Sequence, residues 1–174
     1  MSIDEWAQWE PTERATLCFI RRENEVLLIL KKRGLGAGKI NAPGGRLELG
    51  ETPLQAAIRE TQEEVGVTPH HPEAHGELHF DFVDGYRLHC VVFVAWGCDG
   101  EPVETPEADP MWFPVDAIPY DAMWEDDAHW LPGILEGRVF TGYFRFDGEK
   151  MLDSVVLWDE NPMLQVTHAQ GVNA

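Results

Sequence analysis

The stretch from residue 45 to residue 67 concentrates side chains that could bind a metal ion. Its charged members include Glu51, Arg59, Glu60, Glu63 and Glu64. The last three glutamates stand at positions i, i+3 and i+4, so a helix would project their carboxylates from one side. Clustered carboxylates repel unless a cation lies among them, and oxygen ligands without nearby His or Cys favour Mg²⁺ or Mn²⁺ over zinc. The alternative is a solvated acidic face, which would have no reason to keep Arg59 and Glu51 at these spacings.

The same stretch carries the signals that start and stop a helix. Thr52 is a good N-cap, Pro53 suits the first helical position, and Gln55 completes a capping box. Gly66 supplies a left-handed residue, so the helix should end at about Val65. The three- and four-residue spacing predicts a buried stripe made of Leu54, Ala57, Ile58, Thr61 and Val65.

With these spacings in view, the stretch resembles the Nudix box, G-x5-E-x7-R-E-U-x-E-E-x-G-U, where U is a bulky aliphatic residue. The match runs from Gly45 to Val67, and its one departure is Thr61 at the first U position. The resemblance implies three metal ligands, Glu60, Glu63 and Glu64, one of which would also activate water. It implies that Arg59 orients the glutamates and that Glu51 adds a ligand or an outer contact. The catalytic set implied in this way is Glu51, Arg59, Glu63 and Glu64.

Composition limits the partners of the chain. Its 174 residues are 44% hydrophobic and 25% charged, which is ordinary for one soluble domain. The formal net charge of −18 would repel duplex nucleic acid and anionic membranes. We therefore expect a small nucleotide substrate that arrives with a divalent metal, no polymeric nucleic acid and no membrane partner. The oligomeric state stays open.

Other residue types suggest less chemistry. Cys18, Cys90 and Cys98 lie in or beside apolar runs, which predicts reduced, buried thiols in a cytoplasmic protein. No signal peptide precedes the first strand, and no apolar run approaches the ~20 residues that span a bilayer. Among the histidines, His79 and His89 look isolated, and solvated or structural roles are expected for all of them.

The order of predicted elements indicates an α+β fold. Strands are expected at 16–20, 26–30, 77–83, 86–96, 111–113, 139–146 and 151–158, with hairpin turns that include Asp84-Gly85. A helical turn is expected at 114–118, and a second helix from Asp126 or Asp127 toward residue 135, interrupted or delayed by Pro132. An irregular N-terminal arm at 1–13, a Nudix domain at 14–158 and a C-terminal tail at 159–174 complete the division. This order fits an α/β/α sandwich, with a mixed sheet between helices, as the Nudix resemblance implies.

Two further segments, 31–41 and 123–153, resemble one branch of the family, the oxidised purine nucleoside triphosphatases. Carried over by position, the base-reading residues would be Asn41, Trp124, Asp126 and Asp127. Phe80 would form a hydrophobic wall of the pocket and Lys31 would line it, while Gly44 and Gly45 would permit close backbone approach. Glu107 aligns with a further metal-site glutamate of the branch better than Glu104 does. Ile40 and Pro43 replace bulky aromatic residues of the branch, so the pocket floor differs.

Each of these positions also has an ordinary structural explanation. Asp126 or Asp127 could simply cap a helix, Trp124 could be core, and one of Phe80 and Phe82 must be core if they alternate in a strand. Glu107 could be a solvated loop residue.

The resemblance implies Mg²⁺-dependent hydrolysis of oxidised purine nucleoside triphosphates, such as 8-oxo-dGTP, to the monophosphate and pyrophosphate. Two alternatives stay open. One is a Nudix hydrolase of another substrate, such as ADP-ribose, a dinucleotide polyphosphate or an ordinary nucleotide. The other is a nucleotide sensor without turnover, which the complete set of box glutamates disfavours.

Overall fold

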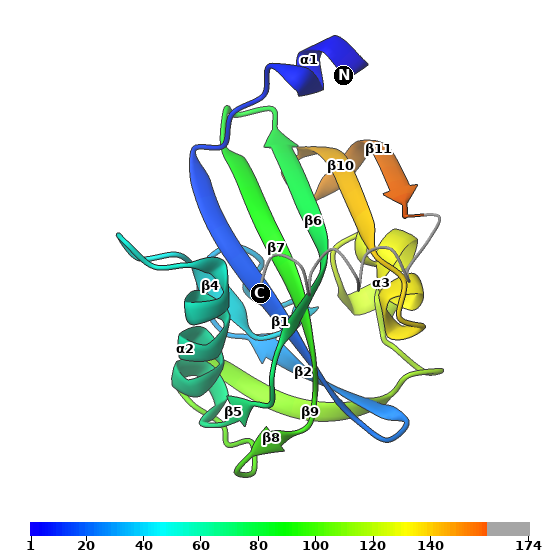
Figure 1. Cartoon of the computed structure of the whole chain (residues 1–174). Helices are drawn as coiled ribbons and strands as arrows, with labels where there is room; N and C mark the ends of the chain where they lie inside the picture. The colour runs from blue at the N-terminus through cyan, green and yellow to red at the C-terminus, as the bar shows by residue number, and fades with distance from the viewer. Residues whose placement is uncertain (160–174) are drawn as a thin grey trace, which may run out of the picture.

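The fold is seen in a computed structural model that describes residues 1–159 (Figure 1). In chain order the elements are α1 (Ile3–Ala7), β1 (Glu13–Arg22), β2 (Glu25–Lys31), β3 (Ile40–Asn41), β4 (Gly44–Arg46), α2 (Pro53–Val65), β5 (Thr68–Pro69), β6 (Glu73–Phe82), β7 (Arg87–Trp96), β8 (Cys98–Asp99), β9 (Ala108–Pro114), a 3-10 turn (Tyr120–Ala122), α3 (Asp127–Leu135), β10 (Phe140–Asp147) and β11 (Lys150–Trp158). The tail predicted at 159–174 lies outside the described residues except for Asp159.

One large mixed sheet forms the centre of the molecule. Its main strand order is β11-β10-β6-β7-β1-β2-β3, with β4 paired to β1 and β9 paired to β2. The pairs β1–β7 and β10–β6 are parallel and the others are antiparallel. The strand predicted to be central and buried is β7, and it lies between β6 and β1.

The two longer helices pack on opposite faces of this sheet. Side chains alternate along β1, so Cys18 and Ile20 join the cluster that holds Val65 of α2, whereas Phe19 joins the cluster that holds Trp130 of α3. The predicted α/β/α arrangement with a mixed sheet is therefore confirmed.

The termini of α2 lie where the sequence predicts them. The Thr52 hydroxyl accepts from the Gln55 N–H at 3.2 Å, and the Gln55 side chain accepts from the Thr52 N–H at 2.9 Å. Gly66 has φ of 75° and its N–H donates to the Gln62 carbonyl, which ends the helix.

The predicted buried stripe of α2 is partly wrong. Leu54 is 42% exposed and Ile58 is only partly buried, while Ala56 and Glu64 are buried instead. The small side chains of Ala56 and Ala57 let the helix lie close to the sheet, and this contact rotates the buried face toward Glu64. Thr61 is fully buried as expected, since its hydroxyl donates to the Ala57 carbonyl at 2.7 Å.

Three smaller predictions also need correction. The N-terminal arm is not wholly irregular, because Ser2 and Glu5 form a capping box that starts α1. Residues 114–118 form no helix, because Pro114 ends β9 and a turn follows at 115–116. Pro132 does not interrupt α3, which continues to Leu135 because burial of Leu131 and Ile134 holds its last turn against the sheet.

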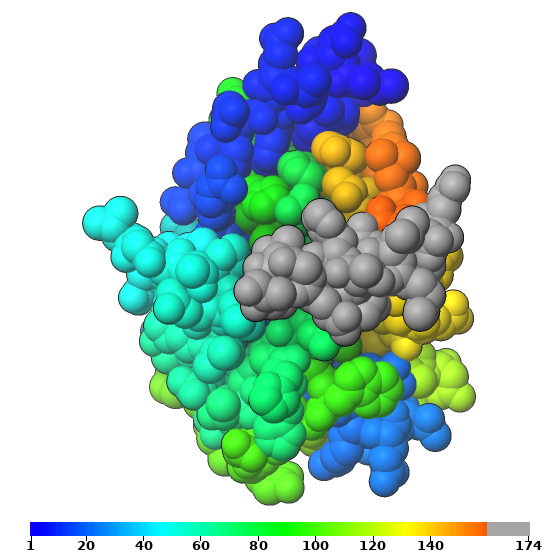
Figure 2. Space-filling model, in the orientation of Figure 1, coloured from blue at the N-terminus to red at the C-terminus, as the bar shows by residue number. Residues whose placement is uncertain are grey.

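The N-terminal residues, which include α1, lie at the top of the molecule in Figure 2, at one end of the sheet drawn in Figure 1. Trp6 of α1 contacts Tyr143 of β10, and Trp9, just beyond the helix, contacts His79 of β6. The Trp9 indole N–H also donates to Asp81 at 3.1 Å. These aromatic contacts attach the N-terminal segment to β6 and β10.

The three cysteines are free thiols. Cys18 and Cys90 are buried as predicted, but Cys98 is partly exposed. Among residues 1–159, no helix is long and apolar enough to cross a membrane.

Candidate active site

A cavity of about 790 Å³ lies between the glutamates of α2 and the start of α3. It brings together most of the predicted site residues, namely Lys31, Asn41, Gly44, Gly45, Glu60, Glu64, Phe80, Glu107, Trp124, Asp126 and Asp127. Three predicted residues do not line it, namely Glu51, Arg59 and Glu63. The cavity thus has an acidic end at α2 and an aromatic and carboxyl end at α3.

Two glycines of β4 make room for the glutamates of α2. A Cβ on Gly45 would lie 2.4 Å from the Glu60 carboxyl carbon, so only glycine fits without moving that side chain. A Cβ on Gly44 would lie 2.0 Å from the Thr16 carbonyl oxygen. The Gly44 N–H also donates to Glu64 Oε1 at 2.9 Å. The glycine pair therefore permits the close backbone approach that was expected. Gly44 lies against the backbone of β1, and Gly45 lies against the Glu60 side chain of α2.

The buried glutamates are held in surroundings that favour a cation. Burial raises the pKa of Glu64 to about 8, with the neighbouring Glu60 and Glu107 adding to the effect and the Gly44 N–H and Lys31 opposing it. Burial also raises the pKa of Glu60. The donor atoms at this end are carboxylate oxygens, which are the ligands that hard divalent cations prefer. The residues present therefore fit a divalent metal ion.

Arg59 connects the glutamates that border this acidic end. Its Nη1 donates to Glu60 at 2.8 Å and to Glu63 at 3.2 Å, while Nε and Nη2 hold Glu51. These bonds lower the pKa of Glu51 to about 2. The orienting role implied for Arg59 therefore has a direct geometric basis, and Glu51 contacts the arginine from outside the cavity.

Glu63 does not join Glu60 and Glu64 in a compact ligand cluster. Its side chain is 51% exposed and turns toward Arg59. Among the described residues, these three glutamates do not bring one oxygen each within 4.8 Å of one another. Mutual repulsion separates the carboxylates, and Arg59 neutralises part of their charge.

The acidic loop before β9 contributes Glu107 and not Glu104. Glu107 lines the cavity, and its carboxylate lies 3.9 Å from Arg33. Glu104 instead pairs with Lys32 at 2.5 Å. The alignment that favours Glu107 agrees with this placement, although half of its side chain stays in solvent.

The opposite end of the cavity has an aromatic wall. Trp124 packs edge to face on Phe146 at 5.5 Å and on Phe82 at 6.3 Å. Phe82 belongs to the buried core, as expected for one of the pair. It also lines the cavity together with Phe80, because residues two apart in a strand face the same side of the sheet. A flat ring such as Trp124 offers a surface on which a base can stack.

Asp126 and Asp127 are almost fully buried at this end. Asp126 accepts from the Trp130 indole N–H at 2.9 Å, and neither side chain caps α3. One oxygen of each carboxyl group is buried without a hydrogen-bond partner. Burial raises the pKa of both carboxyl groups, and the nearby Asp126 carboxyl group raises that of Asp127 further, so the pair can share one proton. The pair can offer one donor and one acceptor to a ligand.

Two features of this region were missed from the sequence. Lys39 lies with its Nζ 5.4 Å from the Trp124 ring, and its charge opposes the raised pKa of Asp127. Gly36 fits under Trp124, because a Cβ there would lie 2.7 Å from the indole nitrogen. The closely spaced glycines at 34, 36 and 38 were the available signal. Asn41 also lines the cavity, and its Oδ1 accepts from the Ala42 N–H.

The NUDIX domain model matches residues 11–134 of this chain. The chain belongs to the Nudix family. The matched range includes α2, most of α3 and residues from both ends of the cavity. The Nudix assignment therefore covers the residues from which the site is built.

Named relatives and solved structures agree with this Nudix assignment. An oxidized purine nucleoside triphosphate hydrolase of Danio rerio is 43% identical over 138 residues, covering 79% of this chain and 88% of that protein. The corresponding Mus musculus protein is 38% identical, covering 82% of this chain and 92% of that protein. The crystal structure of a MutT protein from Bacillus halodurans superposes with a TM-score of 0.75 at 28% identity, covering 83% of this chain and 97% of that one.

Proposed function

We propose that this Nudix protein hydrolyses oxidised purine nucleoside triphosphates, with 8-oxo-dGTP and 2-oxo-dATP as the first candidates, to the monophosphate and pyrophosphate. One observation carries the proposal. The buried pair Asp126 and Asp127 faces the same cavity as Glu60 and Glu64, so a nucleotide could place its base at one end and its phosphates at the other. The two relatives named as oxidized purine nucleoside triphosphate hydrolases support the same substrate class.

At the acidic end, Glu60 and Glu64 would hold a divalent cation, with Glu63 and Glu107 at its border. We propose Mg²⁺ as the ion, with Mn²⁺ able to substitute, because the ligands are carboxylate oxygens. When bound, such an ion shields phosphate charge and supplies an activated water for in-line attack on phosphorus. Arg59 keeps the glutamates in position through its bonds to Glu51, Glu60 and Glu63. Lys31 is the cation placed to meet a phosphate.

At the base end, we propose that Trp124 stacks on the purine and that Asn41, Asp126 and Asp127 bond its edge. Phe80 forms the apolar wall. The protonated member of the pair donates and the ionised member accepts, and an acid pair that can exchange this proton suits more than one oxidised purine. Removal of oxidised nucleotides would protect the DNA precursor pool, and we propose that the protein does this in the cytoplasm.

The test is a hydrolysis assay over a panel that contains 8-oxo-dGTP, 2-oxo-dATP, dGTP, dATP, ADP-ribose and a dinucleotide polyphosphate. Products are separated so that the monophosphate with pyrophosphate is distinguished from the diphosphate with phosphate. Mg²⁺ and Mn²⁺ are compared at equal concentration, with a chelator as the blank. Higher kcat/KM for the two oxidised purines than for dGTP and dATP is expected. Preference for ADP-ribose or for the dinucleotide would overturn the substrate assignment, and no turnover of any compound would favour a sensor.

Two substitutions and a matched control test the metal assignment in the same assay. Glu63→Gln and Glu64→Gln should each lower kcat by orders of magnitude while leaving the circular dichroism spectrum unchanged. Glu101→Gln is the control, since Glu101 is an exposed loop residue outside the cavity. Rates like those of the wild type in both Glu63→Gln and Glu64→Gln would contradict the ligand assignment.

A further inference from the structure

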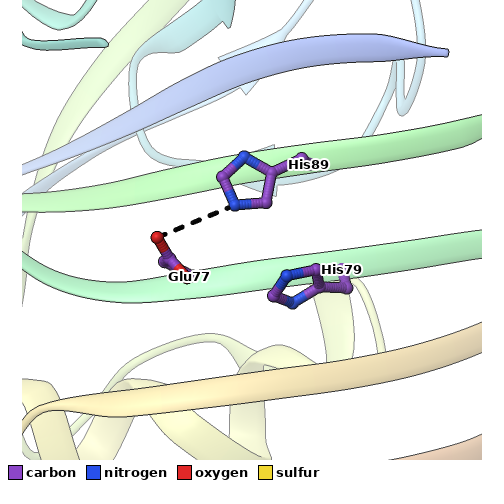
Figure 3. Close-up of side chains that lie close together, drawn as sticks. All are labelled: Glu77, His79 and His89. Atoms are coloured by element: carbon purple, nitrogen blue, oxygen red, sulfur yellow. Dashed lines mark ion pairs between the residues drawn. The ribbon is translucent and has the colours of Figure 1, made fainter. Parts of the chain in front are cut away.

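Glu77, His79 and His89 form a second cluster of possible metal ligands, away from the Nudix glutamates (Figure 3). One ligand atom from each of these side chains lies within 4.8 Å of the other two. It is the single group of this kind among residues 1–159. The expectation that His79 and His89 are isolated is therefore wrong, because they are separated by ten residues in sequence but paired across strands.

Strand register produces this cluster. His79 of β6 lies directly opposite His89 of β7, and their ring centroids are 5.0 Å apart. Glu77 stands two residues before His79, so it points to the same face of the sheet. Figure 3 shows the three side chains together on the two neighbouring strands. The glutamate oxygen lies 3.9 Å from His89 Nε2, which is too long for a direct hydrogen bond and leaves space between the two groups.

The surroundings orient His79 as a metal ligand. Its Nδ1 lies 3.1 Å from the Gly142 carbonyl oxygen, which can only accept, so Nδ1 carries the proton and Nε2 is left to coordinate. The ring is held on one side by Tyr143, stacked at 4.6 Å, and at its edge by Trp9. A hydrogen bond from the other ring nitrogen to a backbone carbonyl is a usual feature of a metal-binding histidine, and the aromatic neighbours limit the movement of the ring.

We propose that Glu77, His79 and His89 form a binding site for a zinc-type transition-metal ion. Two imidazoles and one carboxylate are a common ligand set for Zn²⁺ and a poor one for Mg²⁺, which prefers oxygen. Zinc bonds of about 2.0–2.2 Å require the ligands to move closer together. Glu77 can make this movement, because its side chain is 53% exposed, whereas His89 is mostly buried.

The nearest strand neighbour that would oppose the ion is Arg14, which lies opposite His89 on β1. Arg14 is exposed, so water and salt screen its charge.

The proposed site is separate from the nucleotide cavity. Leu88 and Cys90 line that cavity, and His89 between them points to the opposite face of β7. In the same way Phe80 lines the cavity and His79 faces away from it. The zinc site and the Nudix site therefore lie on two faces of the same strands, and they differ in ligand chemistry.

The test is a Zn²⁺ titration by calorimetry in excess Mg²⁺, which keeps the carboxylate site occupied. One Zn²⁺ per chain is expected. Glu77→Gln, His79→Gln and His89→Gln should each weaken binding at least about tenfold. His129→Gln is the matched control, since His129 is exposed on α3, and it should bind Zn²⁺ like the wild type. Co²⁺ gives a second readout, because its visible absorption bands report nitrogen ligation and should be lost in the histidine variants.

Glu77→Gln keeps the inference testable if a histidine variant fails to fold, because Glu77 is exposed and nearly isosteric with glutamine. Zn²⁺ binding that survives all three substitutions would overturn the proposal. Zn²⁺ binding that is lost in Glu64→Gln but kept in His89→Gln would also overturn it, by assigning the ion to the acidic cavity. The titration does not use turnover, so failure of the proposed hydrolase activity would leave its result unchanged.

Discussion

Arg59 and Glu51 form a two-bond ion pair, in which Nε and Nη2 of the arginine donate to the two carboxylate oxygens at 2.7 and 2.8 Å. The planar guanidinium fits the carboxylate with both nitrogens and still leaves Nη1 for Glu60 and Glu63. Arg59 therefore holds three glutamates at once, and a single ammonium group has no equivalent geometry.

Arg59→Lys should lower kcat/KM for the preferred nucleotide by about 10- to 100-fold, since partners that orient metal ligands have effects of this size. The charge is kept, so the loss would come from the missing hydrogen bonds. Steady-state kinetics at several Mg²⁺ concentrations measure the effect. Arg22→Lys is the matched control, because Arg22 pairs with Glu25 on the exposed surface. A kcat/KM like that of the wild type in Arg59→Lys would show that Arg59 acts through its charge alone, and an equal loss in Arg22→Lys would show that the effect is not specific to Arg59.

The two glycines of β4 should respond differently to a methyl group. Gly45→Ala places a Cβ against the end of the Glu60 side chain, which can move, so the fold should survive while Mg²⁺ affinity falls by on the order of tenfold. Gly44→Ala places a Cβ against the backbone of Thr16, which cannot move freely, and should destabilise the protein by roughly 1–3 kcal/mol. Thermal unfolding with a chelator and metal titration separate the two effects. Equal Mg²⁺ affinity in Gly45→Ala and wild type would contradict the close packing on Glu60.

Metal binding should release a proton from Glu64. Burial raises the pKa of this carboxyl group from 4.5 to about 8, so it is protonated in the metal-free protein at pH 6–7 and must ionise to bind a cation. Mg²⁺ affinity should therefore rise with pH up to about 8 and then level off. Calorimetry in buffers of different ionisation enthalpy measures the released proton, and Glu64→Gln should abolish the release. Mg²⁺ affinity that is independent of pH between 6 and 8 would refute this assignment.

The raised pKa of Glu64 also determines how the free energy of unfolding of the metal-free protein changes with pH. The folded state holds the Glu64 proton up to about pH 8, whereas the unfolded chain loses it near the ordinary value of 4.5. The free energy of unfolding should therefore fall as pH rises between these values, and Glu64→Gln should reduce the slope. Unfolding curves in a chelator at several pH values measure it.

Local signals made α2 predictable. Thr52, Pro53, Gln55 and Gly66 determine its ends through contacts within a few residues, and the structure keeps all of them. The hairpin between β6 and β7 was predictable for the same reason, since its turn signal, Asp84-Gly85, is local. The rotation of α2 on the sheet was not predictable from spacing alone, because it depends on how closely Ala56 and Ala57 approach the strands. Leu54 was assigned to the wrong face for this reason.

Contacts between distant segments were harder to derive. The pairing of His79 with His89 depends on the register of β6 and β7, which a spacing rule for one strand does not contain. The placing of Glu64 and Asp127 at two ends of one cavity depends on how α2 and α3 pack against the sheet. It became predictable only through the resemblance of two segments to one branch of the Nudix family. The roles of the site residues stay predictions, since the structure shows their positions and contacts and not their chemistry.

The two buried aspartates should be distinguishable by substitution. Asp127→Asn keeps a hydrogen-bond donor at this position but blocks exchange of the proton with Asp126, so it should change the ratio of kcat/KM between 8-oxo-dGTP and 2-oxo-dATP without abolishing hydrolysis. In Asp126→Asn the amide oxygen would keep the hydrogen bond from the Trp130 indole, so an N–H would replace the oxygen that faces the base. The N–H donors of a guanine edge would then lose their acceptor, and kcat/KM should fall at least about tenfold, as expected for loss of a charged hydrogen bond. Activity on 8-oxo-dGTP should therefore fall more than activity on 2-oxo-dATP. Kinetics with both nucleotides, and with the exposed control Asp121→Asn, test the difference. An equal fall for both nucleotides in Asp126→Asn would mean that this carboxylate supports the pocket without reading the base.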